Sequence, residues 1–225
     1  MELVKTKGFY VFSILYIIFI SIISIYLNGF VEFDPTNYKM LFIAIILWLL
    51  LYIPIPISVM KAKYEISEFG FKITKALLIS LPIFLIFILP KANYDISINT
   101  LYWAILFSFA RVGEEVFYRG FIYTLCLKLF KNTNTPWNWA IVLSSLLFAM
   151  MHTQYDFGIM VSTFILAIFL GLLRHITDSI LIPIIIHCAL AGGILTIIMG
   201  IFIYFIFVLI GFLRKEKVLE LVKLR

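Results

Sequence analysis

The sequence predicts an all-α, polytopic membrane protein, and three observations lead to that class. Hydrophobic residues make up 64% of the 225-residue chain, and only 13% of its residues are charged, about half the share found in soluble domains. The apolar residues lie in runs close to the length of a bilayer-crossing helix, separated by short polar segments. No polar stretch is long enough for a separate soluble domain, so we expect residues 1–225 to form a single transmembrane domain.

We expect about eight membrane-spanning helices. The runs assigned to them are residues 9–28, 40–60, 76–90, 101–127, 140–153 and 159–173, with two more spans inside 179–213. That last stretch is too long for one span and slightly short for two, so loop charge decides the count. Connections rich and poor in Lys and Arg alternate, which places both termini in the cytoplasm and requires an even number of spans. The last two spans are expected to turn near Gly192–Gly200.

The fourth expected span contains an unusual set of charges. Residues 110–121 read A-R-V-G-E-E-V-F-Y-R-G-F, and each isolated charge at membrane depth costs roughly 2.5–3.5 kcal/mol. On an α-helix Arg111, Glu115 and Arg119 recur every four residues, so we expect a ladder of opposite charges on one face. Glu114 points about 100° away from Glu115 and has no cation four residues away. The sequence therefore predicts a paired Glu115 and a Glu114 free for chemistry.

Two histidines in other apolar spans, His152 and His187, are candidates to join Glu114. Two chemistries are open for such a set. The carboxylate can act as general base on a water that the imidazoles orient, or the three side chains can bind a metal such as zinc or iron. The chain has no H-E-x-x-H segment, so spacing gives no independent evidence for a metal. A single histidine on an apolar helix more often hydrogen-bonds a neighbouring helix, and for Glu115 and Arg119 an ion pair holding the helix is favoured.

The net charge of +6 does not indicate nucleic-acid binding, because the lysines lie in loops and at the ends of apolar runs. Cys126 and Cys188 both lie in apolar segments, so we expect no disulfide framework. The small size and the Ile-, Lys- and Asn-rich composition favour the cell membrane of a prokaryote.

At these residues the sequence resembles the CPBP intramembrane proteases, the type II CAAX prenyl endopeptidases and bacteriocin-processing proteins. The family's motifs E-E-x-x-x-R, F-x-x-x-H and a final His are matched in order by Glu114, Glu115 and Arg119, by Phe148 and His152, and by His187. The resemblance covers roughly residues 104–191, under half of the chain. Three motifs in order, on separate spans, are fairly specific.

The resemblance implies an intramembrane endopeptidase that cleaves a lipidated or membrane-associated peptide in the lipid bilayer. It implies that Glu114 activates water with the help of His152, and that His187 faces the oxyanion. Glu115 and Arg119 would support that site. The substrate would be a peptide or a prenylated, membrane-anchored protein, and no nucleic acid takes part. If a metal is used, the resemblance implies Zn²⁺ on Glu114, His152 and His187; a metal-independent reaction stays open.

The chain departs from the family at Ala191, four residues after His187, where the family has Asn or Asp. Loss of one oxyanion donor typically costs on the order of 10²–10³ in rate. The alternative hypothesis is therefore a catalytically impaired member that acts as a binding, bacteriocin-immunity or regulatory membrane protein. A transporter or proton relay also buries Glu, Arg and His, but the sequence has no inverted repeat of the kind that secondary transporters show.

Overall fold

The computed structural model describes residues 2–30, 50–61, 63–88, 98–153 and 155–223. Within these residues every regular element is a helix, which confirms the all-α prediction. The elements are α1 (Glu2–Phe30), α3 (Pro54–Lys61), the 3₁₀-helix η1 (Ile66–Phe69), α4 (Lys75–Ile88), α5 (Ile98–Glu115), the π-helix η3 (Val116–Ile122), α6 (Tyr123–Leu129), α7 (Pro136–Met150), α8 (Phe157–Thr177), α9 (Leu181–Gly192) and α10 (Ile194–Lys223).

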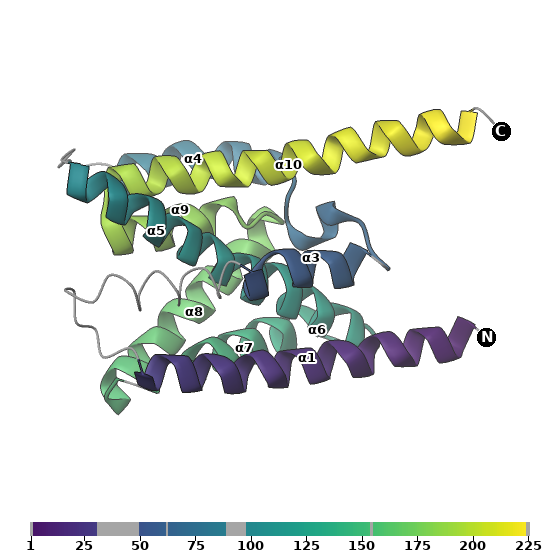
Figure 1. Ribbon diagram of the computed structural model, residues 1–225, viewed down its shortest axis with the longest axis horizontal. Coiled ribbons are helices and arrows are strands. Elements are labelled where there is room, and N and C mark those ends of the chain that lie inside the picture. Colours follow the sequence, from purple (N-terminus) through teal and green to yellow (C-terminus); the bar gives the residue numbers. More distant parts are fainter. Residues whose placement is uncertain (1, 31–49, 62, 89–97, 154, 224–225) are drawn as a thin grey trace.

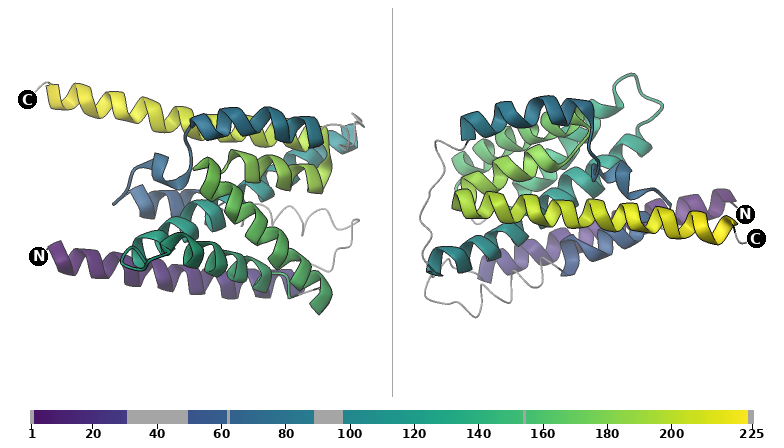
Figure 2. Two further views of the ribbon diagram at one scale, coloured as in Figure 1. Left: turned by 180° about the vertical axis from the view of Figure 1, so that it is seen from behind. Right: turned by 90° about the horizontal axis from the view of Figure 1, so that it is seen from above.

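Two long helices lie on opposite sides of the molecule. Figure 1 shows α1 along one side, α10 with α4 along the other, and α5, α8, α9 and α6 between them. α5 packs against both α9 and α10, and α7 packs against α8. Both ends of the chain lie at the same end of the molecule in all three views (Figures 1 and 2). The helices between α1 and α10 therefore form the interior in which buried polar groups can meet.

Two helices of the described residues are long and apolar enough to cross a membrane. They are Gly8–Tyr26 and Phe157–Thr177, within α1 and α8. Shorter apolar helices are Leu50–Lys61, Lys75–Ile86, Pro136–Met150, Leu181–Leu190 and Ile194–Ile206. The count of eight spans thus stays a prediction, and the first part of the second expected span (residues 40–60), residues 40–49, lies outside the described residues.

The helix boundaries follow from local chemistry. α7 begins with Pro136 in its first turn, where the missing N–H of proline costs nothing. Asp156 caps α8 by accepting a hydrogen bond from the backbone N–H of Ile159 at 3.0 Å. α9 ends at Gly192, and the next residue, Gly193, has a φ of 77°, in the region that favours glycine. The predicted turn between the last two apolar segments is at this glycine.

The charged stretch is helical from Ile98 to Leu129, but its middle is not α-helical. Residues 116–122 form the π-helix η3, and all seven of these residues are buried. The expectation of one regular α-helix is therefore wrong at this point. A Cβ on Gly120 would lie 3.4 Å from the carbonyl oxygen of Phe69, so glycine lets η1 pack closely on the π-helix. Single π-helical turns of this kind are frequent at functional sites.

Candidate active site

The two carboxylates of the E-E-x-x-x-R motif are the last residues of α5, directly before the π-helix. Glu114 is 4% exposed, and Glu115 and Arg119 are fully buried. Arg119 Nη1 donates to Glu115 Oε1 at 3.1 Å, and Nη2 donates to the backbone carbonyl of Ala167 at 3.3 Å. The guanidinium of Arg119 also lies over the ring of Phe148, 4.5 Å from its centroid. The predicted Glu115–Arg119 ion pair is confirmed, and it joins α5 and the π-helix to α7 and α8.

Glu114 also has a cationic partner, so the prediction that this carboxylate is unpaired is wrong. Arg111 Nη1 lies 3.1 Å from Oε1 and 2.8 Å from Oε2 of Glu114. The expected ladder paired Arg111 with Glu115, four residues later. In the structure Arg111 pairs with Glu114 instead, three residues later. Both spacings lie on one helical face, and sequence alone does not choose between them. Each carboxylate thus has its own guanidinium, and the four side chains together carry no net charge.

His187 of α9 lies between the two carboxylates. Its Nδ1 is 2.7 Å from Glu115 Oε1, and its Nε2 is 3.5 Å from Glu114 Oε2. Because Glu115 accepts a hydrogen bond at this distance, a neutral His187 carries its proton on Nδ1 and leaves Nε2 as an acceptor. Two acceptors, Nε2 and Glu114 Oε2, then face each other. A water molecule that donates to both satisfies this arrangement.

His152 lies in the turn after α7 and is partly exposed. Its Nδ1 is 2.9 Å from the carbonyl oxygen of Phe148. A carbonyl can only accept, so Nδ1 carries the proton and Nε2 is the nitrogen available for chemistry. The ring of Phe148 contacts both imidazoles, at 4.8 Å from His152 and 5.7 Å from His187. Phe148 thus brings the two histidines together, and His152 is also within electrostatic range of Glu114.

The residues present do not fit a metal ion in this arrangement. Arg111 occupies both oxygens of Glu114 with a cation, and His187 directs one nitrogen at Glu115. Within the part of the chain that the structure describes, no three His, Cys, Asp or Glu side chains are arranged to hold a metal. Ala191, at the family's Asn or Asp position, lies in the last turn of α9, and its side chain is outside the described set.

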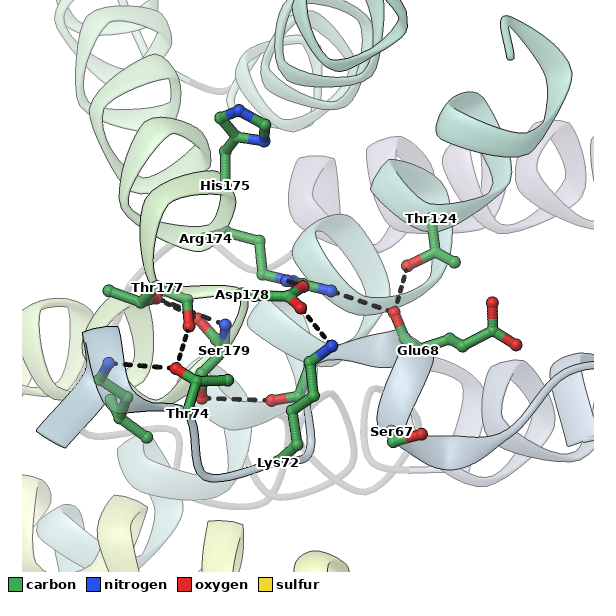
Figure 3. Close-up of polar contacts among 12 residues, drawn as sticks. Ser67, Glu68, Lys72, Thr74, Thr124, Arg174, His175, Thr177, Asp178 and Ser179 are labelled. Carbon is green, nitrogen blue, oxygen red and sulfur yellow. Dashed lines mark hydrogen bonds and ion pairs between the residues drawn. The ribbon is translucent and has the colours of Figure 1, made fainter.

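A second buried arginine supports the π-helix from outside the site, and sequence reasoning missed it. Figure 3 shows Arg174, at the end of α8, pointing toward η1. Arg174 is 2% exposed, and it donates to the backbone carbonyls of Arg119 at 3.3 Å and Glu68 at 3.0 Å. Its Nη1 also bonds Asp178 Oδ1 at 2.9 Å. In the sequence Arg174 directly follows an apolar run, and an arginine at that position is equally consistent with an ordinary surface charge.

Asp178 joins this network from the loop between α8 and α9. It has a φ of 50° and pairs with both Lys72 and Arg174 (Figure 3). Burial alone would raise the pKa of this carboxyl, but the hydrogen bonds and charges of Lys72 and Arg174 outweigh it and lower the pKa. Asp178 is thus ionised in the folded protein and holds Arg174 in position.

Comparison with known proteins agrees with the geometry. The family model described as type II CAAX prenyl endopeptidase Rce1-like matches residues 95–193, which contain every motif residue. This match confirms the family predicted from the three motifs. No curated protein and no solved structure matches the chain. Residues 95–193 of the chain are thus similar to the Rce1-like type II CAAX prenyl endopeptidases, a family of membrane proteases.

Proposed function

We propose that this protein is an intramembrane endopeptidase in which Glu114 and His187 activate a water molecule. The observation that carries the proposal is the position of His187 on α9, with one ring nitrogen 2.7 Å from Glu115 and the other 3.5 Å from Glu114. Glu115 fixes the tautomer and the orientation of the imidazole, as the orienting carboxylate does in other Glu/His and Asp/His pairs. The water lies where Glu114 Oε2 and His187 Nε2 can both accept its protons.

The reaction follows from these positions. The water oxygen attacks the scissile carbonyl carbon while Glu114 takes a proton from that water, and the carbonyl oxygen becomes an oxyanion. The C–N bond then breaks, and Glu114 gives the proton to the leaving nitrogen. Nδ1 of His187 is engaged by Glu115 and Nδ1 of His152 by the Phe148 carbonyl, so both neutral imidazoles present Nε2 as an acceptor. We therefore assign His187 to orienting the attacking water; an imidazole of this site stabilises the oxyanion only after Nε2 has gained a proton.

The site supports a metal-independent reaction better than a zinc-dependent one, because a guanidinium already faces Glu114. We therefore propose no step through Zn²⁺. Prolonged treatment with a metal chelator is expected to leave the rate of the reconstituted protein unchanged. A rate that falls with the chelator and returns on addition of zinc would refute this part of the proposal.

The environment of the reaction is the lipid bilayer of a cell membrane, which we propose the chain crosses several times as one domain with both termini in the cytoplasm. Two observations support this: the apolar helices α1 and α8, and the position of both chain ends at one end of the molecule (Figure 1). The substrate class that fits is a lipidated or membrane-anchored peptide, with no role for nucleic acid. The composition favours a prokaryotic cell membrane.

The direct test is hydrolysis of a fluorogenic peptide with a farnesylated cysteine by the protein in liposomes. Glu114→Gln is expected to lower kcat/KM by about 10²–10⁴-fold, the usual contribution of a positioned general base. Glu65→Gln serves as the matched control, because Glu65 is an exposed carboxylate directly before η1. Activity that survives Glu114→Gln would exclude this carboxylate as the base. A wild-type protein that binds the peptide but never cleaves it would favour the alternative of a family member acting by binding.

A further inference from the structure

The contact between Arg111 and Glu114 occupies the group on which the proposed reaction depends. Arg111 Nη1 lies within hydrogen-bond distance of both carboxylate oxygens, at 2.8 and 3.1 Å. A carboxylate held in this way accepts charge-assisted hydrogen bonds, which are about twice as strong as neutral ones. Its basicity toward water is correspondingly reduced. The arrangement in the structure is therefore a resting one, and the reaction needs Arg111 to move or to find another partner.

The two ion pairs of the site differ in how firmly the arginine is held. Arg119 and Glu115 both have fully buried side chains, and Arg119 has a second partner in the carbonyl of Ala167. The Arg111 side chain is 23% exposed and faces a Glu114 side chain that is 5% exposed. Arg111 is thus the arginine of the site that reaches the surface of the protein.

The guanidinium of Arg111 is also incompletely satisfied. Its Nε is buried and makes no hydrogen bond to any residue that the structure describes. A buried donor without an acceptor costs stability unless something binds it. The edge of a guanidinium that carries Nε matches a carboxylate with two parallel hydrogen bonds, whereas a single carbonyl oxygen fills only one.

We propose that Arg111 is the specificity-determining residue of the site, and that it binds a carboxylate of the substrate in exchange for Glu114. This inference rests on the proposed function. When the substrate carboxylate binds, Arg111 remains paired with a negative charge, and Glu114 is released to accept a proton from water. Arg111 is then never left unpaired, whereas Glu114 becomes an unpaired carboxylate in an apolar interior; because such a charge is expensive, Glu114 is driven to take up a proton.

Two groups of a peptide can supply that carboxylate: its C-terminus, or an Asp or Glu side chain near the scissile bond. Three peptides of one sequence distinguish them. The first ends in a free carboxylate, the second ends in an amide, and the third ends in an amide but carries Glu at its last position. The kcat/KM of each is measured with wild type, with Arg111→Met, and with Lys63→Met. Lys63 is an exposed cation that lies over aromatic rings of α1, so its removal controls for loss of one positive charge.

We expect wild type and Lys63→Met to prefer a carboxylate peptide over the plain amide by about tenfold or more, the effect of a charged hydrogen bond. Arg111→Met is expected to cleave all three peptides at rates within about twofold of one another. The peptide that loses most identifies the source of the carboxylate. If Arg111 only tuned Glu114, Arg111→Met would change all three rates by one factor and preserve the preference, which would overturn the proposal.

A binding measurement keeps the inference separate from the proposed function. Glu114→Gln stops turnover in the proposed mechanism, so the affinity of the same peptides for this variant can be measured directly. Tighter binding of a carboxylate peptide than of the amide, lost in Arg111→Met, supports the inference even if no peptide is cleaved. Equal affinities for all three peptides refute it, whether or not wild type proves to be a protease.

Discussion

Removal of either partner of the Glu115–Arg119 ion pair is expected to destabilise the whole protein. Both side chains are fully buried, with Nη1 and Oε1 3.1 Å apart. Glu115→Gln leaves the Arg119 charge with the carbonyl of Ala167 and the ring of Phe148 as its remaining contacts. Breaking a buried pair on one side typically costs about 3–5 kcal/mol, against a total stability of roughly 5–15 kcal/mol. Arg119→Met should cost a similar amount, because it leaves Glu115 as the uncompensated charge.

The double variant should cost less than the sum of the two single variants by about 1–3 kcal/mol, because no charge is then left alone. Denaturant unfolding in mixed micelles measures the free energies of this cycle. Glu114→Gln provides the comparison within the same helix. Its partner Arg111 is partly exposed, so water can solvate the charge left behind, and we expect a smaller loss than for Glu115→Gln. A loss below 1 kcal/mol for Glu115→Gln, or strict additivity in the double variant, would refute the view that this pair holds the site together.

Two further variants test the Arg174 network. Gly70 has a φ of 89°, and a Cβ there would lie 2.7 Å from Arg174 Nε; Gly70→Ala should lower both stability, by about 1–3 kcal/mol, and activity. Gly8→Ala, within α1 and with open space around its Cβ, should leave activity unchanged and should not lower stability. Asp178 has a lowered pKa in the folded state, so its stabilising effect is complete above its unfolded pKa of roughly 4 and is lost as the pH falls through the lower folded value. Asp178→Asn should therefore reduce the melting temperature at pH 7, and the reduction should become progressively smaller as the pH falls below about 4. A reduction that does not change with pH would contradict the assigned charge.

The elements that the sequence predicted correctly are those fixed by short spacings. Glu115 and Arg119 are four residues apart, and this pair forms even though a π-helix begins between them. The motif residues Glu114, His152 and His187 come from separate segments. They were candidates for one site because they are ionisable side chains in apolar spans, and the family resemblance then gave each of them a role. The motif residue Phe148 packs against the rings of both His152 and His187.

The elements that could not be predicted depend on contacts between a side chain and a distant backbone. Arg174 binds the carbonyls of Arg119 and Glu68, 55 and 106 residues away, and a carbonyl is present at every position of any sequence. The choice of Arg111 between Glu114 and Glu115 is similar, because spacings of three and four are both compatible with a helix. The π-helix has no residue signature of its own, and the close approach of η1 at Gly120 is a contact between segments far apart in the sequence.

The position of Arg111 also changes how a reactive carboxylate should be recognised in such a sequence. The helical spacing predicted that Glu114 is reactive because it has no cation four residues away. An unpaired carboxylate, however, would be too costly in an apolar interior to remain ionised. Both glutamates of this site are paired, and what separates them is the exposure of the partner: 0% for Arg119 and 23% for Arg111. Glu115, held by a buried arginine and by His187, is suited to keep the imidazole in place. Glu114, held by an arginine that reaches the surface, can exchange its partner for a substrate group, and this makes it the carboxylate suited to take a proton from water.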